Sequence, residues 1–119
     1  MQGPVSFNFS PLVGIGGLAN PLAGWQYEFP DVDCLVEVIL DATAVGLVAA
    51  LFSGGDTIQQ ESPISSGGVA GVIPNVLNGT VVTGRARKGM RLSLNIRNPT
   101  AGAQTVNGKV TLIPGRGRR

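Results

Sequence analysis

The sequence has no histidine and only one cysteine among its 119 residues. Zinc and copper sites in proteins are built mainly from histidine and cysteine, so the chain lacks the usual ligands for either metal. Cys34 has no second cysteine for an intrachain disulfide and no histidine to act as its base. It lies in the largely apolar run 34–40, where we interpret it as a buried core thiol. We expect no cofactor, no bound metal and no enzymatic activity.

Charged and aromatic residues are also scarce. Charged residues make up 13% of the chain, whereas soluble domains average about 25%. Aromatic residues make up 5%, so the core must be built mainly from Val, Leu, Ile and Ala. A surface with few charges leaves extended uncharged patches, which proteins commonly use as interfaces. This composition favours a protein that assembles with copies of itself or with other proteins.

No sustained helical pattern is present, and no stretch is suited to crossing a membrane. Residues 1–27 and 62–84 carry no charged side chain, but prolines and glycines interrupt both stretches. We therefore expect no membrane-spanning helix. We also expect no secretion signal, because no basic segment opens the chain.

The chain does contain a series of short β-type segments separated by Gly/Pro turns. Residues 33–41, 90–97 and 105–112 alternate apolar and other side chains with the period of a strand. Gly108 lies at an inward position of the last segment, where a bulge or a close backbone approach is expected. Residues 44–62 predict a hairpin with Gly54-Gly55 at its tip.

This spacing of strands predicts an all-β fold, a single β-sandwich that is jelly-roll-like. We place the sandwich domain at residues 25–114, beginning with a half-buried strand over Trp25–Phe29. Residues 1–24 are expected to form an extended N-terminal arm, either a loop over the domain edge or a segment that docks on a neighbouring subunit. Residues 115–119 form a basic C-terminal tail.

Charge is distributed unevenly along the chain. All acidic residues lie in the first half and all basic residues follow residue 84, so residues 1–84 carry −7 and residues 85–119 carry +9. We predict an acidic face between subunits on the segment 33–41, formed by Asp33, Glu37 and Asp41. The candidate contacts to a polyanion or an acidic partner are Arg85, Arg87, Lys88, Arg91, Arg97, Lys109, Arg116, Arg118 and Arg119.

The basic residues have two interpretations, which the sequence leaves open. Arginine can bind either phosphate oxygens or carboxylates with its two-pronged guanidinium. The basic third could contact a nucleic-acid backbone without reading bases, since it contains no aromatic residue for stacking. Alternatively, its arginines could meet the acids of the first half, within or between chains. Pairing residues 90–97 with 105–112 would place Arg91, Arg97 and Lys109 on one outer face.

Residues 88–100 and 104–114, together with 51–62, resemble the strands of small β-sandwich virion structural proteins of bacteriophages, of the penton, minor capsid or decoration type. The resemblance implies a structural subunit that acts by self-assembly and by contacts with other capsid proteins. It also implies a virion location, with assembly in the host cytoplasm. The resemblance identifies no functional residue in this chain.

Two other functions stay open at this point. One is a small nucleic-acid-binding β-barrel that uses the basic C-terminal third. The other is a carbohydrate- or receptor-binding module, for which Trp25, Tyr27 and Phe29 would supply an aromatic platform.

Overall fold

The computed structural model describes residues 3–74, 79–100 and 102–114. Every regular element within these ranges is a β-strand. The strands are β1 (Val5–Phe9), β2 (Leu12–Val13), β3 (Leu18–Ala19), β4 (Cys34–Ala42), β5 (Val48–Ser53), β6 (Asp56–Pro63), β7 (Thr80–Ala86), β8 (Leu92–Arg97) and β9 (Gln104–Pro114).

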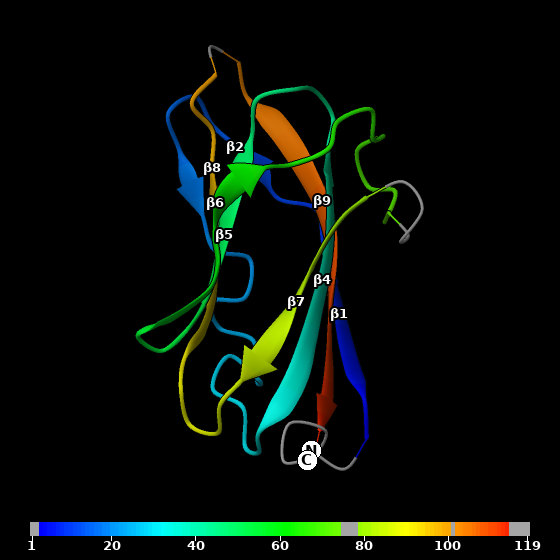
Figure 1. Ribbon diagram of the computed structural model, residues 1–119. Coiled ribbons are helices and arrows are strands. Elements are labelled where there is room, and N and C mark those ends of the chain that lie inside the picture. The colour runs from blue at the N-terminus through cyan, green and yellow to red at the C-terminus, as the bar shows by residue number, and fades with distance from the viewer. Residues whose placement is uncertain (1–2, 75–78, 101, 115–119) are drawn as a thin grey trace.

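These strands form two antiparallel sheets that pack face to face (Figure 1). One sheet has the order β1-β9-β4-β7, with β2 also paired to β9, and the other has the order β3-β8-β5-β6. When β1 and β2 are counted as one interrupted strand, the eight strands have the orders 1-8-3-6 and 2-7-4-5. That arrangement is a jelly roll, in which the chain crosses repeatedly between two sheets. The predicted fold class is confirmed.

The core lies between the sheets and contains the side chains that alternation predicted. Every second residue of β4 from Cys34 to Leu40 is buried, and so are the inward residues of β8 and β9. The hairpin predicted with Gly54-Gly55 at its tip is present as β5 and β6. Gly108 stands in register with Phe9 on one side and Leu40 on the other, and both side chains close over it. The close approach expected at this glycine is therefore observed.

The segment Trp25–Phe29 is a succession of turns, so the strand predicted there is wrong. The N–H of Trp25 donates to the carbonyl of Leu22 at 3.1 Å, and the N–H of Glu28 donates to that of Trp25 at 2.9 Å. The alternation of aromatic and polar residues has another cause. The ring of Trp25 stacks on that of Phe7 with centroids 5.3 Å apart, and the ring of Tyr27 lies nearly perpendicular to that of Trp25 with centroids 5.6 Å apart. Both rings pack against the core cluster.

Residues 5–22, which were expected to belong to an arm, are part of the sandwich of their own chain and supply three of its strands. β1 and β2 pair with β9, and β3 pairs with β8. Phe9, Val13 and Leu22 are buried in the core. The physical reason is the length of β9, whose outer edge would lack a hydrogen-bonding partner without β1 and β2.

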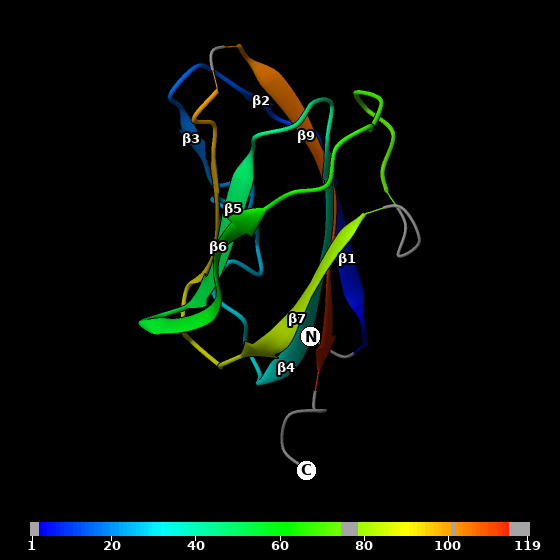
Figure 2. The ribbon, with the colours of Figure 1, turned by 45° about the horizontal axis from the view of Figure 1, so that its top comes forward.

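The antiparallel topology divides the connections between two ends of the molecule (Figures 1 and 2). The connections after β2, β4, β6 and β8 lie together at one end. Those after β3, β5 and β7 lie at the other end, beside the start of β1 and the end of β9. The molecule measures 42 × 27 × 22 Å, and its longest dimension runs between these two ends.

Candidate interaction surfaces

The acidic and basic halves of the sequence meet within the folded chain. Arg97 forms a two-pronged ion pair with Glu61, with N–O distances of 2.8 and 2.7 Å. The Nε atoms of two further arginines lie near carboxylates: Arg91 at 2.5 Å from Glu28, and Arg87 at 3.3 Å from Asp56. For these arginines, the structure shows pairing within one chain.

Two of these ion pairs shift the acidity of their carboxylates. The backbone N–H of Gly24, followed by the Arg91 guanidinium, holds the pKa of Glu28 below its usual value. The Arg97 hydrogen bond does the same to the pKa of Glu61. Because the folded-state pKa is lowered, each pair stabilises the fold above the ordinary pKa of 4.5 and loses that contribution as the pH falls through the lower, folded-state value.

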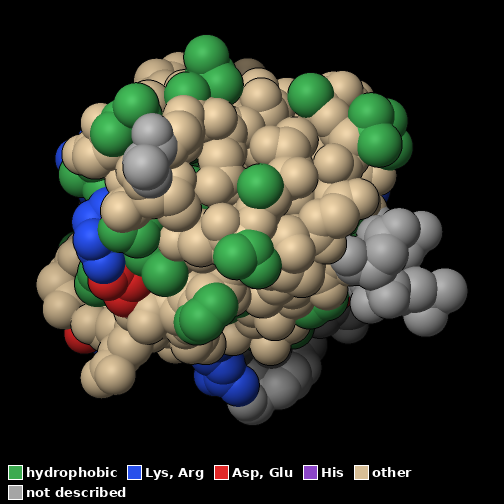
Figure 3. Space-filling view, turned by 90° about the horizontal axis from the view of Figure 1, so that it is seen from above, with side chains coloured by type: hydrophobic (Ala, Val, Ile, Leu, Met, Phe, Trp, Pro, Cys, Tyr) green, Lys and Arg blue, Asp and Glu red, His purple; other side chains and the backbone are tan. Residues whose placement is uncertain are grey.

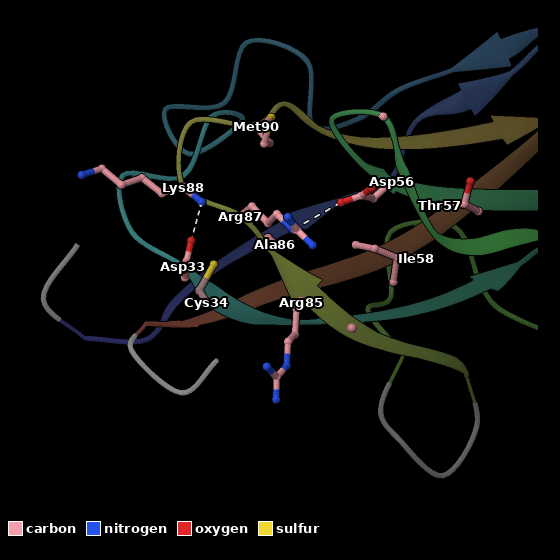
Figure 4. Close-up of a pocket in the computed structure, with 12 residues that line it drawn as sticks. Asp33, Cys34, Asp56, Thr57, Ile58, Arg85, Ala86, Arg87, Lys88 and Met90 are labelled. Carbon is pink, nitrogen blue, oxygen red and sulfur yellow. Dashed lines mark hydrogen bonds and ion pairs between the residues drawn. The ribbon is translucent and has the colours of Figure 1, made fainter. Parts of the chain in front are cut away.

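A groove of about 960 Å³ opens at the end where β1 begins and β9 finishes, between the β5–β6 turn and the end of β7 (Figure 4). Arg85 and Lys88 extend outward from it in different directions, whereas Arg87 reaches across to Asp56. The backbone N–H of Lys88 donates to Asp33 at 2.8 Å. The groove therefore combines acids with bases and is not a uniformly basic site.

The single basic face predicted from residues 90–97 and 105–112 is wrong. β8 and β9 belong to different sheets, so Arg97 and Lys109 lie on opposite outer surfaces of the sandwich. Arg91 lies before β8, at the end that holds the groove. The turn at residues 98–102 has the composition of a hairpin, but here it carries the chain from one sheet to the other. Arg116, Arg118 and Arg119 lie outside the described residues.

The three residues predicted to form an acidic face are in three different environments. Asp33 is exposed just before β4, and Glu37 lies partly exposed on the outer face of the sheet, in register with threonines of β7 and β9. Asp41 is only 6% exposed and accepts a hydrogen bond of 2.9 Å from Nδ2 of Asn107. The β6–β7 connection covers that part of the sheet, because Gly68 and Gly71 bond to β4 and to Asn107. Asp41 is therefore not part of an exposed face.

Cys34 lies in the core with no exposed surface, and burial, followed by the charges of Asp33 and Asp31, raises its pKa to about 11 from an ordinary value of 9.0. We expect a thiol reagent at mildly alkaline pH to label the native protein at least ~100-fold more slowly than the denatured chain, because the thiolate fraction falls tenfold per pKa unit. The measurement is the labelling rate with and without denaturant. Equal rates would contradict a buried thiol.

The aromatic residues considered for carbohydrate binding do not form a platform. Trp25 and Tyr27 are half-buried, with their rings packed on Phe7 and on each other. Phe29 is 56% exposed but stands apart from this cluster. Sugar-binding platforms need an exposed ring face, which Trp25 turns toward Phe7 instead.

The end opposite the groove has an unusual composition, which we call the uncharged end. It comprises residues 12–18, 43–47, 64–74, 98–100 and 102–103, and it contains no Asp, Glu, Lys or Arg. In a view onto this end, charged side chains lie only toward the rim (Figure 3). Six large aliphatic side chains here are 58–75% exposed: Leu12, Ile15, Leu18, Val45, Val69 and Val72.

The positions of the charged residues in the sequence indicate this surface, although the overall composition does not. Its four longest stretches without a charged residue are 1–27, 42–55, 62–84 and 98–108. Each stretch contains one of the four connections at the uncharged end. Because the stretches are far apart in the chain, only the jelly-roll topology shows that they meet.

The described residues contain no group of three or more Cys, Asp and Glu side chains close enough to hold a metal ion. Within the same residues, no helix has the length and apolar character needed to cross a membrane.

Comparisons with known proteins identify no family for this chain. No protein-family model matches it, and no curated protein matches it. A chain of the Bacillus endospore appendages, described as disulfide-linked pili, is similar with a TM-score of 0.47 and 14% identity over 94% of this chain and 88% of that one. A chain from the structure of infectious bursal disease virus, Gx strain, has a TM-score of 0.34 and 12% identity, over 98% of this chain and 33% of that one. Likeness at this level concerns the shape of the fold alone.

Proposed function

We propose that this chain is a structural subunit that assembles with copies of itself and with other shell proteins, in a virion of the bacteriophage type. The observation that supports assembly most directly is the uncharged end, where six large aliphatic side chains are exposed on connections without a single charge. Exposed apolar patches of this kind mark contact surfaces, because each large aliphatic side chain gains about 1.5–3 kcal/mol when it leaves water.

The charge arrangement supports the same proposal over a nucleic-acid-binding barrel. Arg87, Arg91 and Arg97 are occupied by carboxylates of their own chain. Lys109 lies on the sheet opposite Arg97. A nucleic-acid backbone needs several cations along one continuous path, and the described basic residues do not provide one.

Sedimentation equilibrium over a range of protein concentrations tests the assembly. We expect masses that are multiples of the 12.2 kDa subunit and that increase with concentration. A lone monomer at every concentration would reject the proposal. If that monomer also bound an oligonucleotide with a steep salt dependence, the nucleic-acid-binding function would take its place.

Immunolabelling tests the virion location separately. An antibody against the chain should label intact purified particles from the culture that produces the protein. Antigen found only in the soluble fraction, with unlabelled particles, would contradict the virion part and leave self-assembly standing.

A further inference from the structure

We propose that the partner of the uncharged end is the uncharged end of other copies of this chain. The inference rests on the proposed function and specifies the surface through which the subunits meet.

The distribution of charge disfavours the opposite arrangement, in which the uncharged end of one copy meets the groove end of the next. The groove end carries eight charged residues in its connections and at the end of β7: Glu28, Asp31, Asp33, Asp56, Arg85, Arg87, Lys88 and Arg91. Glu28 and Asp56 already pair with Arg91 and Arg87. An apolar surface laid over this end would still remove the remaining water from its charged groups and supply no new hydrogen bond in return, which is costly for ionised groups. A surface without charges is best matched by another such surface, and each further copy of the chain presents one.

The exposed aliphatic residues form two groups on opposite sides of the uncharged end, so one copy can contact other copies through either group. Leu12, Ile15 and Leu18 form one group, from β2 to β3, and Val69 and Val72 form a second group on the β6–β7 connection. The two segments lie on opposite sides of the end in Figures 1 and 2. The β4–β5 connection, which carries Val45, crosses between them.

Buried amide side chains hold these connections in place. Nδ2 of Asn98 donates to the carbonyl of Val13 at 3.0 Å, and Nε2 of Gln104 donates to that of Val45 at 3.2 Å. Nδ2 of Asn107 donates to the carbonyl of Val69 at 3.1 Å. One amide from β9 or the β8–β9 connection therefore holds the end of β2, the β4–β5 connection and the β6–β7 connection. A surface ordered before contact loses less conformational entropy when it binds.

The size of the end limits the area that a contact can bury. Its cross-section, from the two shorter dimensions of 27 and 22 Å, is about 600 Å². Stable interfaces bury roughly 800 Å² on each partner, so a flat contact between two ends lies near the lower limit. We therefore expect association that depends on concentration. It should be stronger when the two groups of exposed aliphatic residues on either side of the β4–β5 connection also make contact.

Disulfide trapping of the full chain tests this arrangement. Val45 is 75% exposed on the β4–β5 connection of the uncharged end, and Lys88 is exposed at the groove end. Under mild oxidation, Val45→Cys should give a disulfide-linked dimer, whereas the matched variant Lys88→Cys should give little. The native Cys34 is buried and should not react. Equal cross-linking of the two variants, or preferential cross-linking of Lys88→Cys, would overturn the inference.

A charge variant provides a second test that does not depend on oxidation. Val45→Asp should raise the dissociation constant of the oligomer at least ~100-fold, since an unpaired carboxylate would be buried at the contact. Phe29→Asp, at an apolar position of the other end that is 56% exposed, should leave the dissociation constant unchanged, and circular dichroism should show both variants folded. A wild-type oligomer that Val45→Asp does not weaken would reject this surface and keep the proposed function. A wild-type monomer would reject both.

Discussion

A chain that lacks residues 1–24 should fail to fold. This deletion removes β1, β2 and β3 together with the buried side chains of Phe9, Val13 and Leu22. Their burial stabilises the fold by about 5–9 kcal/mol in total, taking about 1.5–3 kcal/mol for each, which is comparable with the whole stability of an ordinary domain. The deletion also exposes the outer edge of β9 and opens the core to water.

Far-ultraviolet circular dichroism and the dispersion of amide resonances measure this result. We expect an unfolded spectrum without a cooperative melting transition. The matched control removes residues 116–119, which follow the end of β9 at Pro114, and should melt as the full chain does. If the shortened chain melted cooperatively near the full-length temperature, residues 1–24 would be an independent arm after all.

The substitution Gly108→Val should destabilise the protein by about 3 kcal/mol or more, because overpacking a closely packed core typically costs 1–3 kcal/mol and here the space is already occupied. A Cβ at this position would overlap the ring of Phe9 and lie 2.8 Å from Cδ2 of Leu40. Neither side chain can withdraw easily, since both are buried in the core. The melting temperature should fall by roughly 10 °C or more.

The control for this effect is Gly102→Val, since a Cβ at Gly102 would have no atom within 4 Å. A second variant identifies the cause. Phe9→Ala alone should lower the free energy of unfolding. The double variant Phe9→Ala with Gly108→Val should lower it by less than the sum of the two single variants, because the valine occupies the space that the ring leaves. Strictly additive effects would show that steric overlap with Phe9 is not the reason.

The alternation of side chains predicted which residues are inside, because each strand buries one face and exposes the other. β4, β8 and β9 were predicted on this basis, and Gly108 was recognised by the same reasoning. Alternation says nothing about which sheet a strand joins. The turn after β8 therefore suggested a hairpin, and the predicted basic face combined Arg97 with Lys109 across what proved to be two sheets.

The first 24 residues were misread for a different reason. β2 and β3 have two residues each, and glycines and prolines surround them, so neither shows a strand pattern. Their position is determined by the partners that β9 and β8 offer from the other end of the chain. Similarly, the pairing of acids with bases could be foreseen from the two charged halves, but the choice between pairing within and between chains required the fold.

The position of the first and last strand ends gives any assembly of these subunits two distinct sides. β1 begins and β9 finishes at the groove end. The connections that carry the exposed aliphatic residues lie at the opposite end of the molecule, whose longest dimension is 42 Å. When the uncharged ends gather, every groove end must face away from the centre of contact. A protein or label fused before β1 or after β9 would then be displayed on the distal side, where it would not obstruct the packing of the subunits.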